Sequence, residues 1–510
     1  MDEILASLRH PLLERIISLL PSGFPIYLVG GAVRDAFLKR QSYDLDFVTP
    51  GDSMKIARKL ADDLGAAYFP LDSERKVARV VLKARDDLSI PGAHPLRVDF
   101  SAFQGVDLIS DLQRRDFTIN AMALEIHHLE TLIDPTGGAA DLKSKCLRAC
   151  SASSFLDDPV RILRAGRFSV DLDLKVQSDT LRFMREAKLH LPDVSPERVR
   201  DELFRILIIS HPASSLRILD KLEVLEYILP EVCLLKDVLQ SPPHVMDVWN
   251  HTLDSINRLE SLLDVLAPEY NPDKASNLTL GMVVVHLGRF RQKLADHLNN
   301  ALNPDRPHRG IIFLAALYHD VGKLTTRTVD EQGNFKFIGH DQIAGKLVEK
   351  RGQALKLSNL EIERLVSIVS HHMRPSLLSH PVESPSRKAV YRFFRDTGAA
   401  GVDICLLSLA DMLATYGPTL PQDRWARHVE VVRTLLGAWW EDKEESVFPP
   451  ALINGNDLKE ELKLSTGPII GYLLESIREA QVTGDIQNRQ EALNLARVIV
   501  KENLNTKTGL

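Results

Sequence analysis

The chain has 510 residues, more than one ordinary domain needs, and this length predicts roughly three or four domains. Its content of 44% hydrophobic and 26% charged residues is that of soluble globular proteins, while the net charge of −6 excludes a generally basic surface for nucleic acid and leaves only a local patch. Four cysteines without a CxxC pair exclude a typical cysteine-rich metal site and predict reduced thiols in a cytoplasmic protein.

The N-terminal twenty residues predict an amphipathic helix and not a signal peptide, because charges interrupt their apolar positions. No apolar run is long enough to cross a membrane. From Pro25 to Pro135, short apolar runs alternate with turn residues, which predicts one sheet with helices after Gly31 and from Met54 to Leu64. The runs are IYLVGG, DLDFVTP, ARVVLKA, PLRVDFSAF, AMALEI and TLIDPTGG.

From about Asp141 onward the strand signals stop and the apolar residues follow a helical period. Prolines near 230–243 and the stretch WWEDKEESVFPP near 439–450 predict domain boundaries within this helical part. The sequence shows no internal repeat and no low-complexity tract.

A glycine pair separates a predicted strand from a predicted helix in YLVGGAVRD, Tyr27 to Asp35. Such glycines serve either a packing turn or the close approach of a phosphate to free N–H groups at the start of a helix. Arg34 can add a charge-assisted contact to a phosphate, or it can pair with Asp35 in the first helical turn. This stretch alone leaves both alternatives open.

Two aspartates follow in YDLDF and predict a metal site. Asp44 and Asp46 are two residues apart, so a strand places both carboxylates on one face. Adjacent like charges need a cation between them, and Mg²⁺ prefers oxygen ligands that it shares with substrate phosphates. Asp99 in LRVDFSAF could supply the third carboxylate for two-metal phosphoryl transfer. Solvated aspartates at a strand end are the alternative.

Further segments agree with this pattern, namely DLQRRDFTINAMAL (111–124), LIDPTGGAADLKSKCLR (132–148) and DDPVRILRAGRFS (157–169). Together with LVGGAVRDAFLKR and YDLDFVTP, they resemble the motifs of the class II tRNA nucleotidyltransferase and bacterial poly(A) polymerase family, in the family's order. The resemblance covers about the first two hundred residues. It implies a polymerase-β-type catalytic domain that adds CMP and AMP, from CTP and ATP, to the 3′ end of tRNA with Mg²⁺ at Asp44 and Asp46.

The resemblance also implies a set of nucleotide-binding residues. They are Gly30, Gly31, Arg34, Arg114, Arg115, Asp116, Asn120, Asp158, Arg161 and Arg164. Within this set, Asp116 is expected to orient Arg115 or to cap the following helix. The segment ERVRDELFRIL (197–207) resembles the family's neck helix, and LDSERKVARVV (71–81) lies where the family carries a flexible loop that governs the final A addition.

Asp158 and Arg161 are expected to select the base, since the family uses the corresponding pair to accept cytosine and adenine. Three residues apart, they would share one helix face, with Asp158 accepting from an amino group and Arg161 donating to the ring. An intrahelical ion pair is the alternative. Arg164 and Arg167 extend the row and predict contact with triphosphate, RNA or facing carboxylates. Where the family usually has Glu, this chain has the shorter Asp157.

A second chemistry is indicated by ALYHDVGK, Ala316 to Lys323, which resembles the HD superfamily of metallophosphohydrolases. The ligands expected at this site are His251, His319, Asp320 and Asp411, with His340 and either His371 or His372 at a second metal position. Mixed nitrogen and oxygen ligands suit a divalent transition metal or Mg²⁺. Lys323 could contact a substrate phosphate. The resemblance implies 2′,3′-cyclic phosphodiesterase or phosphatase activity on RNA ends.

The expected fold class is therefore α+β, an N-terminal nucleotidyltransferase sheet domain followed by all-α domains. The expected domains are a head (1–148), a neck (149–235), an HD domain (236–430) and a C-terminal helical domain (431–510). The expected partners are tRNA, ATP and CTP, without a membrane. A poly(A) polymerase, a CC- or A-adding partial enzyme and an HD phosphohydrolase with an RNA-binding N-terminal half are the alternatives. The basic helix RKAVYRFFRD could contact tRNA or pack within the protein.

Overall fold

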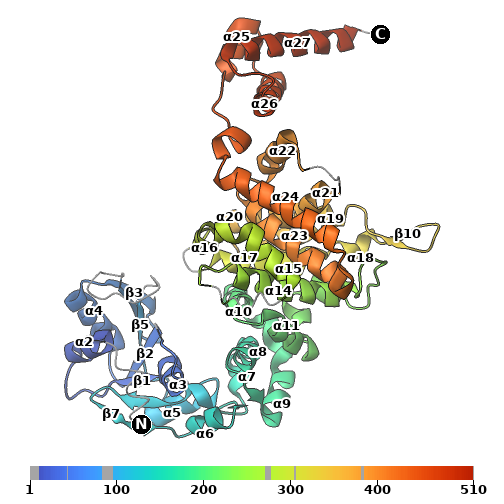
Figure 1. Cartoon of the computed structure of the whole chain (residues 1–510). Helices are drawn as coiled ribbons and strands as arrows, with labels where there is room; N and C mark the ends of the chain where they lie inside the picture. The colour runs from blue at the N-terminus through green and yellow to red at the C-terminus, as the bar shows by residue number, and fades with distance from the viewer. Residues whose placement is uncertain are drawn as a thin grey trace. The chain divides into compact units, whose positions relative to one another are not determined.

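The computed structural model describes residues 11–42, 44–82, 96–269, 271, 277–303, 306–380 and 384–508. Clustering in space divides the chain into two compact units (Figure 1). The first unit comprises Met1–Glu202 and Ser214–Ile228, and the second comprises Leu203–Ala213 and Leu229–Leu510. The chain therefore passes between the units three times, after residues 202, 213 and 228.

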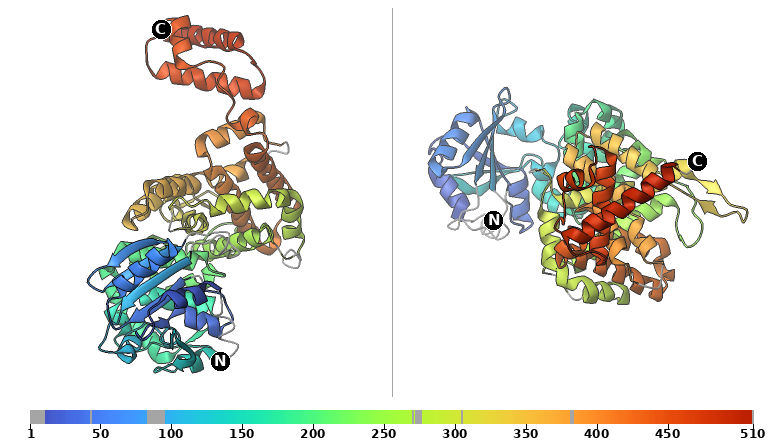
Figure 2. Two further views of the ribbon diagram at one scale, coloured as in Figure 1. Left: turned by 90° about the vertical axis from the view of Figure 1, so that its left-hand side faces the viewer. Right: turned by 90° about the horizontal axis from the view of Figure 1, so that it is seen from above.

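A seven-stranded sheet organises the first unit, in the order β3-β4-β5-β2-β1-β6-β7 (Figure 2). Only β2 and β5 pair in parallel, and the other neighbours are antiparallel. The strands are β1 (Tyr27–Val29), β2 (Asp44–Thr49), β3 (Ala67–Asp72), β4 (Val77–Leu82), β5 (Leu96–Ala102), β6 (Ala123–Glu125) and β7 (His128–Ile133). The sequence predicts all of these except β3, an edge strand whose residues are half-buried or exposed and lack the apolar alternation of the other strands.

Helices cover the sheet at the two predicted places. α3 (Gly31–Phe37) packs against β1 and β2, and α4 (Ser53–Leu64) packs across β3, β4 and β5. The Asp52 side chain accepts a hydrogen bond from the backbone N–H of Lys55 and so caps the start of α4. The predicted N-terminal helix is present as α2 (Pro11–Leu19), and the part of that prediction before residue 11 lies outside the described residues.

The remainder of the first unit is mainly helical. Its helices are α5 (Leu108–Gln113), η2 (Thr118–Asn120), α6 (Gly138–Lys143), α7 (Ser154–Asp157), α8 (Arg161–Asp171), α9 (Ser178–Ala187), η3 (Lys188–Asp193), the start of α10 (Pro196–Ile208), α11 (Pro212–Lys221) and α12 (Leu225–Ile228). A short parallel pair, β8 (Cys146–Leu147) and β9 (Lys175–Val176), interrupts the stretch that the sequence predicts to be wholly helical. Two residues are too few to show a strand period.

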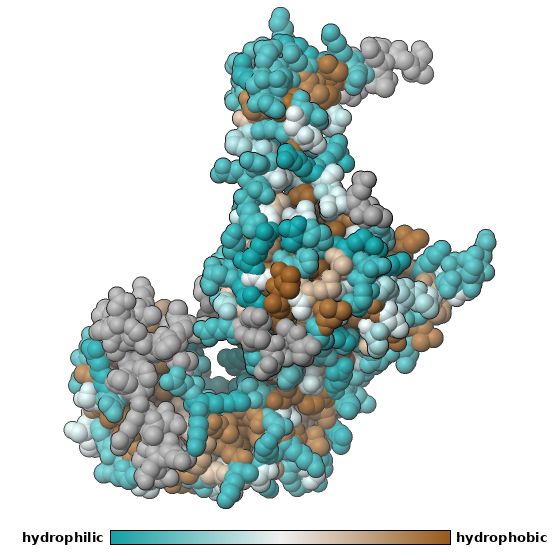
Figure 3. Space-filling model, in the orientation of Figure 1, coloured by the Kyte–Doolittle hydropathy of each residue, from teal (hydrophilic) through white to brown (hydrophobic). Residues whose placement is uncertain are grey.

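The second unit is a helical assembly. Its elements are α13 (Pro230–Cys233), α14 (Val248–Val265), α15 (Leu278–Leu287), η5 (Gly288–Phe290), α16 (Arg291–Asn299), α17 (His308–Tyr318), α18 (Lys323–Thr326), β10 (Thr328–Val329), β11 (Phe335–Lys336), α19 (His340–Ala354), α20 (Asn359–His371), α21 (Arg374–Leu378), α22 (Arg387–Thr397), α23 (Ala400–Tyr416), η6 (Gly417–Thr419), α24 (Gln422–Trp440), η7 (Lys443–Val447), α25 (Gly455–Leu462), α26 (Pro468–Thr483) and α27 (Arg489–Thr508). The β10–β11 hairpin was not predicted, because its strands have two residues each. The tip of this hairpin is hydrophilic (Figure 3).

α23 lies at the centre of this helical unit, in contact with α14, α20, α21 and α24. Contrary to the sequence expectation that no apolar run is long enough, residues 400–419 could span a membrane by length and composition, but 78% of that window is buried among the other helices. A helix that is apolar on all sides is expected in the core of a large helical domain.

The short stretch Leu203–Ala213 is built into the second unit by direct core packing. Leu203, Phe204 and Ile206 are all buried. Gly310, on α17, is in contact with the Phe204 ring, since a methyl group at Gly310 would lie 2.5 Å from Phe204 Cδ1. The ring thus needs a glycine opposite it.

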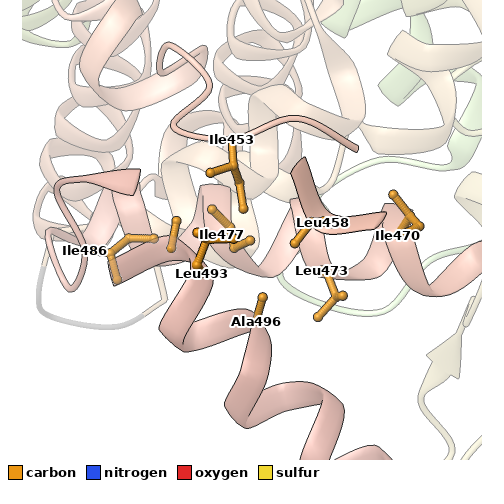
Figure 4. Close-up of a cluster of buried hydrophobic side chains, with 9 residues drawn as sticks. Ile453, Leu458, Ile470, Leu473, Ile477, Ile486, Leu493 and Ala496 are labelled. Atoms are coloured by element: carbon orange, nitrogen blue, oxygen red, sulfur yellow. The ribbon is translucent and has the colours of Figure 1, made fainter. Parts of the chain in front are cut away.

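The C-terminal helices α25, α26 and α27 enclose a hydrophobic cluster of their own (Figure 4). Its buried members are Ile453, Leu458, Ile470, Leu473, Ile477, Ile486, Ala492, Leu493 and Ala496. The side chain of Asn454 accepts hydrogen bonds from backbone N–H groups at the start of α25, and Gly484 ends α26 in a left-handed conformation.

Candidate functional site

The turn between β1 and α3 depends on Gly30. Its φ of 71° and ψ of −127° lie in a region that L-residues with side chains rarely adopt. A methyl group there would lie 3.2 Å from Arg115 Nη1 and 3.6 Å from Asp46 Oδ2. Gly30 therefore keeps open the space beside the acidic strand, which joins the two stretches YLVGG and YDLDF into one site.

Three carboxylates lie on the two parallel strands next to this turn. Asp44 and Asp46 share one face of β2, and Asp46 is directly opposite Asp99 of β5. Arg79 of β4 donates from Nε and Nη2 to the two oxygens of Asp99, both at 2.8 Å. The sequence did not predict Arg79, although the register of β4 and β5 places it beside Asp99.

The charge on these carboxylates favours a bound cation. Burial, together with the neighbouring charges of Asp99 and Asp44, raises the pKa of the Asp46 carboxyl to about 6, against the opposing effect of Arg115. A set of oxygen donors that repel one another fits a hard divalent ion such as Mg²⁺.

Arg34 is held inside the protein. Its Nε and Nη2 donate to Asp35 Oδ1 at 2.9 and 2.7 Å, and its Nη1 donates to Asn120 Oδ1 at 2.8 Å. Arg34 is 9% exposed and its guanidinium lies 5.0 Å from the Phe168 ring centroid. Of the two sequence alternatives, the structure shows pairing with Asp35, and Arg34 also contacts Asn120.

Asn120 belongs to a chain of buried polar contacts that ends at Glu202. Its Nδ2 donates to Asp116 Oδ1 at 3.0 Å, and Arg164 donates from Nε to Asp116 Oδ2 at 2.8 Å. Arg164 and Arg167 both pair with Glu202, at 3.4 and 3.2 Å. The row of arginines on α8 is thus satisfied by carboxylates of the protein, one of the three partners that the sequence allowed.

The electrostatics of these polar contacts favour the ionised forms of Asp116 and Arg164. Burial alone would raise the pKa of the Asp116 carboxyl, but Arg164 and the hydrogen bond from Asn120 overcome it and lower that pKa to about 2. Burial acts against the charge of Arg164, whereas Asp116 and Glu202 outweigh it and raise the pKa of the guanidinium. Glu202, in the segment predicted as the neck helix, was not predicted as part of the site.

Asp116 does not orient Arg115, contrary to one sequence expectation. Arg115 Nη2 instead donates to Asp111 Oδ2 at 3.3 Å, and Arg114 Nη1 donates to the backbone carbonyl of Gln104. Asp111 is buried and reaches Arg115 because the two residues are four apart at the end of α5.

Asp158 presents one bound and one unbound oxygen. Arg198 donates from Nη2 to Asp158 Oδ2 at 2.6 Å, whereas Oδ1 is buried and has no hydrogen-bond partner in the described part of the chain. Asp158 has extended backbone and precedes α8, so the two residues do not share a helix face, but Arg161 Nε still lies 3.8 Å from Asp158 Oδ2, the ion pair that the sequence offered as the alternative. Arg161 donates to the carbonyls of Arg114 and Ser154, at 3.1 and 3.2 Å.

A cavity of about 1000 Å³ joins the carboxylates to the Asp158 region within the first unit. Asp46 and Asp99 line it together with Asp158, Arg161 and Arg198. The other predicted residues in its wall are Arg114 and Arg115. A nucleotide in this cavity could therefore contact the acidic strands and the base-selecting residues at once.

Two further sequence expectations have a definite place in the structure. Asp157 lines the same cavity and accepts a hydrogen bond from Ser153 Oγ at 2.9 Å. The segment 71–81, expected at the position of a flexible loop, forms the end of β3, a turn and most of β4. The stretch 83–95 that follows lies outside the described residues.

A second site lies in the helical unit, where His251, His319, Asp320 and Asp411 meet. His251 Nε2 lies 3.0 Å from Asp411 Oδ1 and 3.4 Å from Asp320 Oδ2, and His319 Nε2 lies 3.3 Å from Asp320 Oδ2. These side chains come from α14, the end of α17 and α23, and up to 160 positions separate them in the sequence (411 − 251).

Asp320 also faces a second group of ligands. His340 Nε2 lies 3.4 Å from Asp320 Oδ1 and 3.4 Å from His372 Nε2. Of the two neighbouring histidines that the sequence offered, His372 is the one in this group. His371 is a correction to the predicted ligands, because the turn of α20 directs its Nδ1 to the carbonyl of Ser367 at 2.9 Å.

The ring nitrogens of this centre fit metal ligation. The Nδ1 atoms of His319, His340 and His372 each lie 2.8 Å from a backbone carbonyl, which can only accept, so their Nε2 atoms keep a lone pair in the neutral ring. The Nε2 atoms of His251 and His319 are buried and lie close to carboxylate oxygens, but among the described residues they make no hydrogen bond of suitable geometry. Buried ligand atoms without a hydrogen bond are expected where a metal ion would bind.

The charges around Asp320 agree with this interpretation. Burial alone would raise the pKa of the Asp320 carboxyl, but Lys323 and a protonated His319 outweigh it and hold that pKa well below its usual range. Asp320 and Asp411 in turn raise the pKa of His319, and a bound cation would take the place of that proton. Burial next to His319 and His340 lowers the pKa of His372 to about 4, so its ring is neutral at pH 7. Lys323 Nζ lies 2.7 Å from both Asp320 Oδ2 and Gln240 Oε1, so it is buried beside the ligands.

The basic helix RKAVYRFFRD is α22, and it packs within the protein. Lys388 and Arg392 pair with Glu479 of α26, and Arg395 pairs with Glu475. Of the two alternatives for this helix, the structure shows the packed one.

Four stretches of the chain match known protein families. Residues 26–148 match the poly A polymerase head domain, and residues 173–235 match the RNA- and SrmB-binding site of polymerase A. Residues 286–415 match the HD domain, and residues 450–496 match tRNA nucleotidyltransferase domain 2.

Related proteins cover nearly the whole chain. A CC-adding tRNA nucleotidyltransferase of Geobacter sulfurreducens is 30% identical, over 98% of this chain and 99% of the relative. An A-adding tRNA nucleotidyltransferase of Deinococcus radiodurans is 31% identical, over 91% and 93% respectively. A solved CCA-adding enzyme in complex with ATP shares the fold, with a TM-score of 0.59, 21% identity and 98% of each chain covered. The α+β fold is thereby confirmed, and the chain belongs to the class II tRNA nucleotidyltransferase family with an HD domain.

Proposed function

We propose that this protein is a template-independent nucleotidyltransferase that adds CMP, AMP or both to the 3′ end of tRNA in the cytoplasm. One observation carries the proposal: the acidic strands and the Asp158 region line the same cavity. A site of this kind can hold a triphosphate at one side and read its base at the other, without a nucleic-acid template. The four cysteines are free, as a reducing compartment requires.

The acidic strands supply the reaction centre in this proposal. Asp44 and Asp46 would hold Mg²⁺, and Asp99, fixed by Arg79, would be the third carboxylate. Mg²⁺ at these carboxylates would lower the pKa of the attacking hydroxyl and neutralise charge on the leaving group. The 3′-hydroxyl of the RNA bonds to the α-phosphorus of CTP or ATP, and pyrophosphate leaves. Gly30 keeps the space beside Asp46 clear for the phosphates.

Base selection rests on the unbound oxygen of Asp158. Arg198 fixes the carboxylate through Oδ2, which leaves Oδ1 to accept from the exocyclic amino group that cytosine and adenine share. Guanine and uracil present a carbonyl oxygen at the corresponding position and would face an acceptor. Arg161, held by main-chain carbonyls, is the donor of the pair.

Transcripts of tRNA that end before, within and just short of CCA test this function, each with one nucleoside triphosphate at a time. We expect incorporation of CMP, AMP or both, and no GMP or UMP. Asp46→Ala should abolish incorporation. Asp158→Ala should lower discrimination by about 10- to 100-fold, as expected for the loss of one hydrogen bond to a charged group. Efficient GMP or UMP addition by the wild type, or long poly(A) tails, would contradict the proposal.

We further propose that the second site is a metal-dependent phosphohydrolase acting on RNA ends, with His251, His319, Asp320 and Asp411 as ligands of one divalent ion. His340 and His372 would hold a second ion, with Asp320 between the two. Manganese, iron, cobalt, nickel or zinc ions suit these mixed ligands. Hydrolysis of a 2′,3′-cyclic nucleotide, lost in the double variant His319→Ala and Asp320→Ala, is the test, and no turnover with any divalent ion would contradict it.

A further inference from the structure

A cavity of about 930 Å³ in the second unit connects the histidine–aspartate centre to a pair of arginines. Asp320, His340 and Asp411 line it, and so do Arg424 and Arg427 of α24. Arg424 donates from Nη1 to the hydroxyl of Tyr416, a residue of α23 that also lines the cavity.

These two arginines have no carboxylate partner in the described part of the chain. The Nε of Arg427 is buried and makes no hydrogen bond there, and the partner of Arg424 is the neutral Tyr416 hydroxyl. Arg433, further along the same helix, forms a two-point ion pair with Glu430. The partly buried guanidinium of Arg427 is unfavourable without a counter-charge, and a bound anion would satisfy it. Arg424 is exposed and could give the same anion a second contact.

The rest of the cavity wall suits the body of a nucleotide. Phe335 and Phe337, at the β10–β11 hairpin, line it together with Met373 and Met412. The Phe337 ring lies 5.5 Å from Lys323 Nζ, next to Asp320. Aromatic rings accept a stacked base of any sequence, and methionine adapts to an irregular apolar surface.

We propose that this cavity binds a nucleoside with two phosphate groups: a reacting one at the histidine–aspartate centre and a second, non-reacting one at Arg424 and Arg427. The inference rests on the proposed phosphohydrolase function and specifies its substrate class. An RNA 3′ end that carries a terminal phosphate offers this pattern, because the phosphodiester on the 5′ side of its last nucleoside supplies the second group. A mononucleotide with one phosphate does not.

Isothermal titration compares adenosine 3′,5′-bisphosphate with adenosine 3′-monophosphate, in the presence of Ca²⁺. The bisphosphate should bind about 10- to 100-fold more tightly, as expected for charge-assisted hydrogen bonds. The affinity ratio should fall to about one in Arg427→Gln and in Arg424→Gln, a second variant at a more exposed position. Arg433→Gln, which removes a paired arginine from the same helix, should keep the ratio. Where the ligands are turned over, kcat/KM gives the same ratio.

A ratio near one in the wild type, or a ratio that survives Arg427→Gln, would overturn the two-phosphate site. Nucleotides can also bind the first unit, so the assignment depends on the change caused by Arg427, which lies in the second. A dinucleotide with a terminal 3′-phosphate shows where the second phosphate comes from. If it binds as tightly as the bisphosphate, the site accepts an RNA backbone phosphate. If only the bisphosphate binds more tightly than the monophosphate, the ligand is a free nucleotide and not an RNA end. Absent hydrolysis with an intact ratio would reject the hydrolase and keep the binding site.

Discussion

Gly30 combines two requirements, a backbone conformation and an empty space. Its φ of 71° suits glycine, and its missing side chain leaves room beside Arg115 and Asp46. Gly398 has a similar backbone, with φ 52° and ψ −136°, but nothing lies within 4 Å of the position of a side chain there. Alanine at Gly398 would therefore test backbone strain alone, whereas alanine at Gly30 would add a contact with the side chains of the site.

We expect Gly30→Ala and Gly398→Ala to lose similar stability, of the order of 1–3 kcal/mol, because both force alanine into a strained region. Nucleotide incorporation should fall at least tenfold only in Gly30→Ala, because its methyl group meets the side chains that line the phosphate space. Urea unfolding and incorporation into tRNA measure the two effects. Equal loss of incorporation in both variants would mean that Gly30 acts through stability alone.

His428 is a buried histidine that links stability to pH. Its ring lies between Ser379 and Ser408, and burial lowers its pKa from 6.5 to about 4. Between these two values the unfolded chain binds the proton and the folded chain does not, so stability falls as the pH is lowered through this window. One pKa unit corresponds to about 1.4 kcal/mol, so the loss is about 3 kcal/mol.

His428→Gln should remove this share of the pH dependence, since glutamine stays neutral and can still bond to a serine hydroxyl. All four tryptophans lie in the second unit, so their fluorescence in urea reports on it. His244 and His372 have similarly lowered pKa values, so part of the dependence of stability on pH should remain in the variant. An unchanged slope between pH 6.5 and 4 in the variant would contradict the assignment.

At the level of elements, α22 illustrates how an ambiguous pattern is resolved by its partner. A basic helix with aromatic residues is typical of both RNA contact and packing. In the structure its aromatic side chains are buried, and Lys388, Arg392 and Arg395 face the acidic residues of α26. Glu479 is the common partner of all three.

Glu479→Lys should therefore weaken the contact of α26 with α22, because it places a fourth positive charge among three. The expected result is faster proteolysis between α24 and α25, with tRNA incorporation reduced at most slightly. Glu460→Lys, an equal change in charge at an exposed position of α25, is the control. Restored resistance in Glu479→Lys with Arg392→Glu would show that charge is responsible, and equal sensitivity of the two single variants would contradict it.

The sequence predicted most helices and strands. It predicted the residues of the candidate sites better than the side chains that pair with them. Strands with apolar alternation and the HD residues are visible in one chain, because the chemistry requires those residue types in that order. The pairings of Arg198 with Asp158, Arg79 with Asp99 and Glu202 with Arg164 were missed, because a single sequence carries no signal that joins residues 20 to 40 positions apart. His371 and His372 are adjacent, and only the turn of α20 decides between them.

At the scale of the whole molecule, the two proposed metal sites belong to different units and should respond to metal separately. Mn²⁺ added to chelator-treated protein should stabilise the second unit by about 2.7 kcal/mol at a hundredfold excess over Kd, because ions bind only the folded ligand set. Tryptophan fluorescence in urea measures this. His251→Ala should lose the response, and Asp46→Asn should keep it. A response that persists in His251→Ala would place the ion elsewhere.

The interlaced path of the chain has a consequence for biosynthesis. Residues 203–213 leave the ribosome before the first unit is complete, yet Phe204 finds its partner, Gly310, only about a hundred residues later. The apolar side chains of this stretch therefore stay exposed until the ribosome has synthesised the helices that cover them. A single recombination point would separate either Leu203–Ala213 from the second unit or Ser214–Ile228 from the first, so the two units cannot be exchanged whole between relatives by one recombination event.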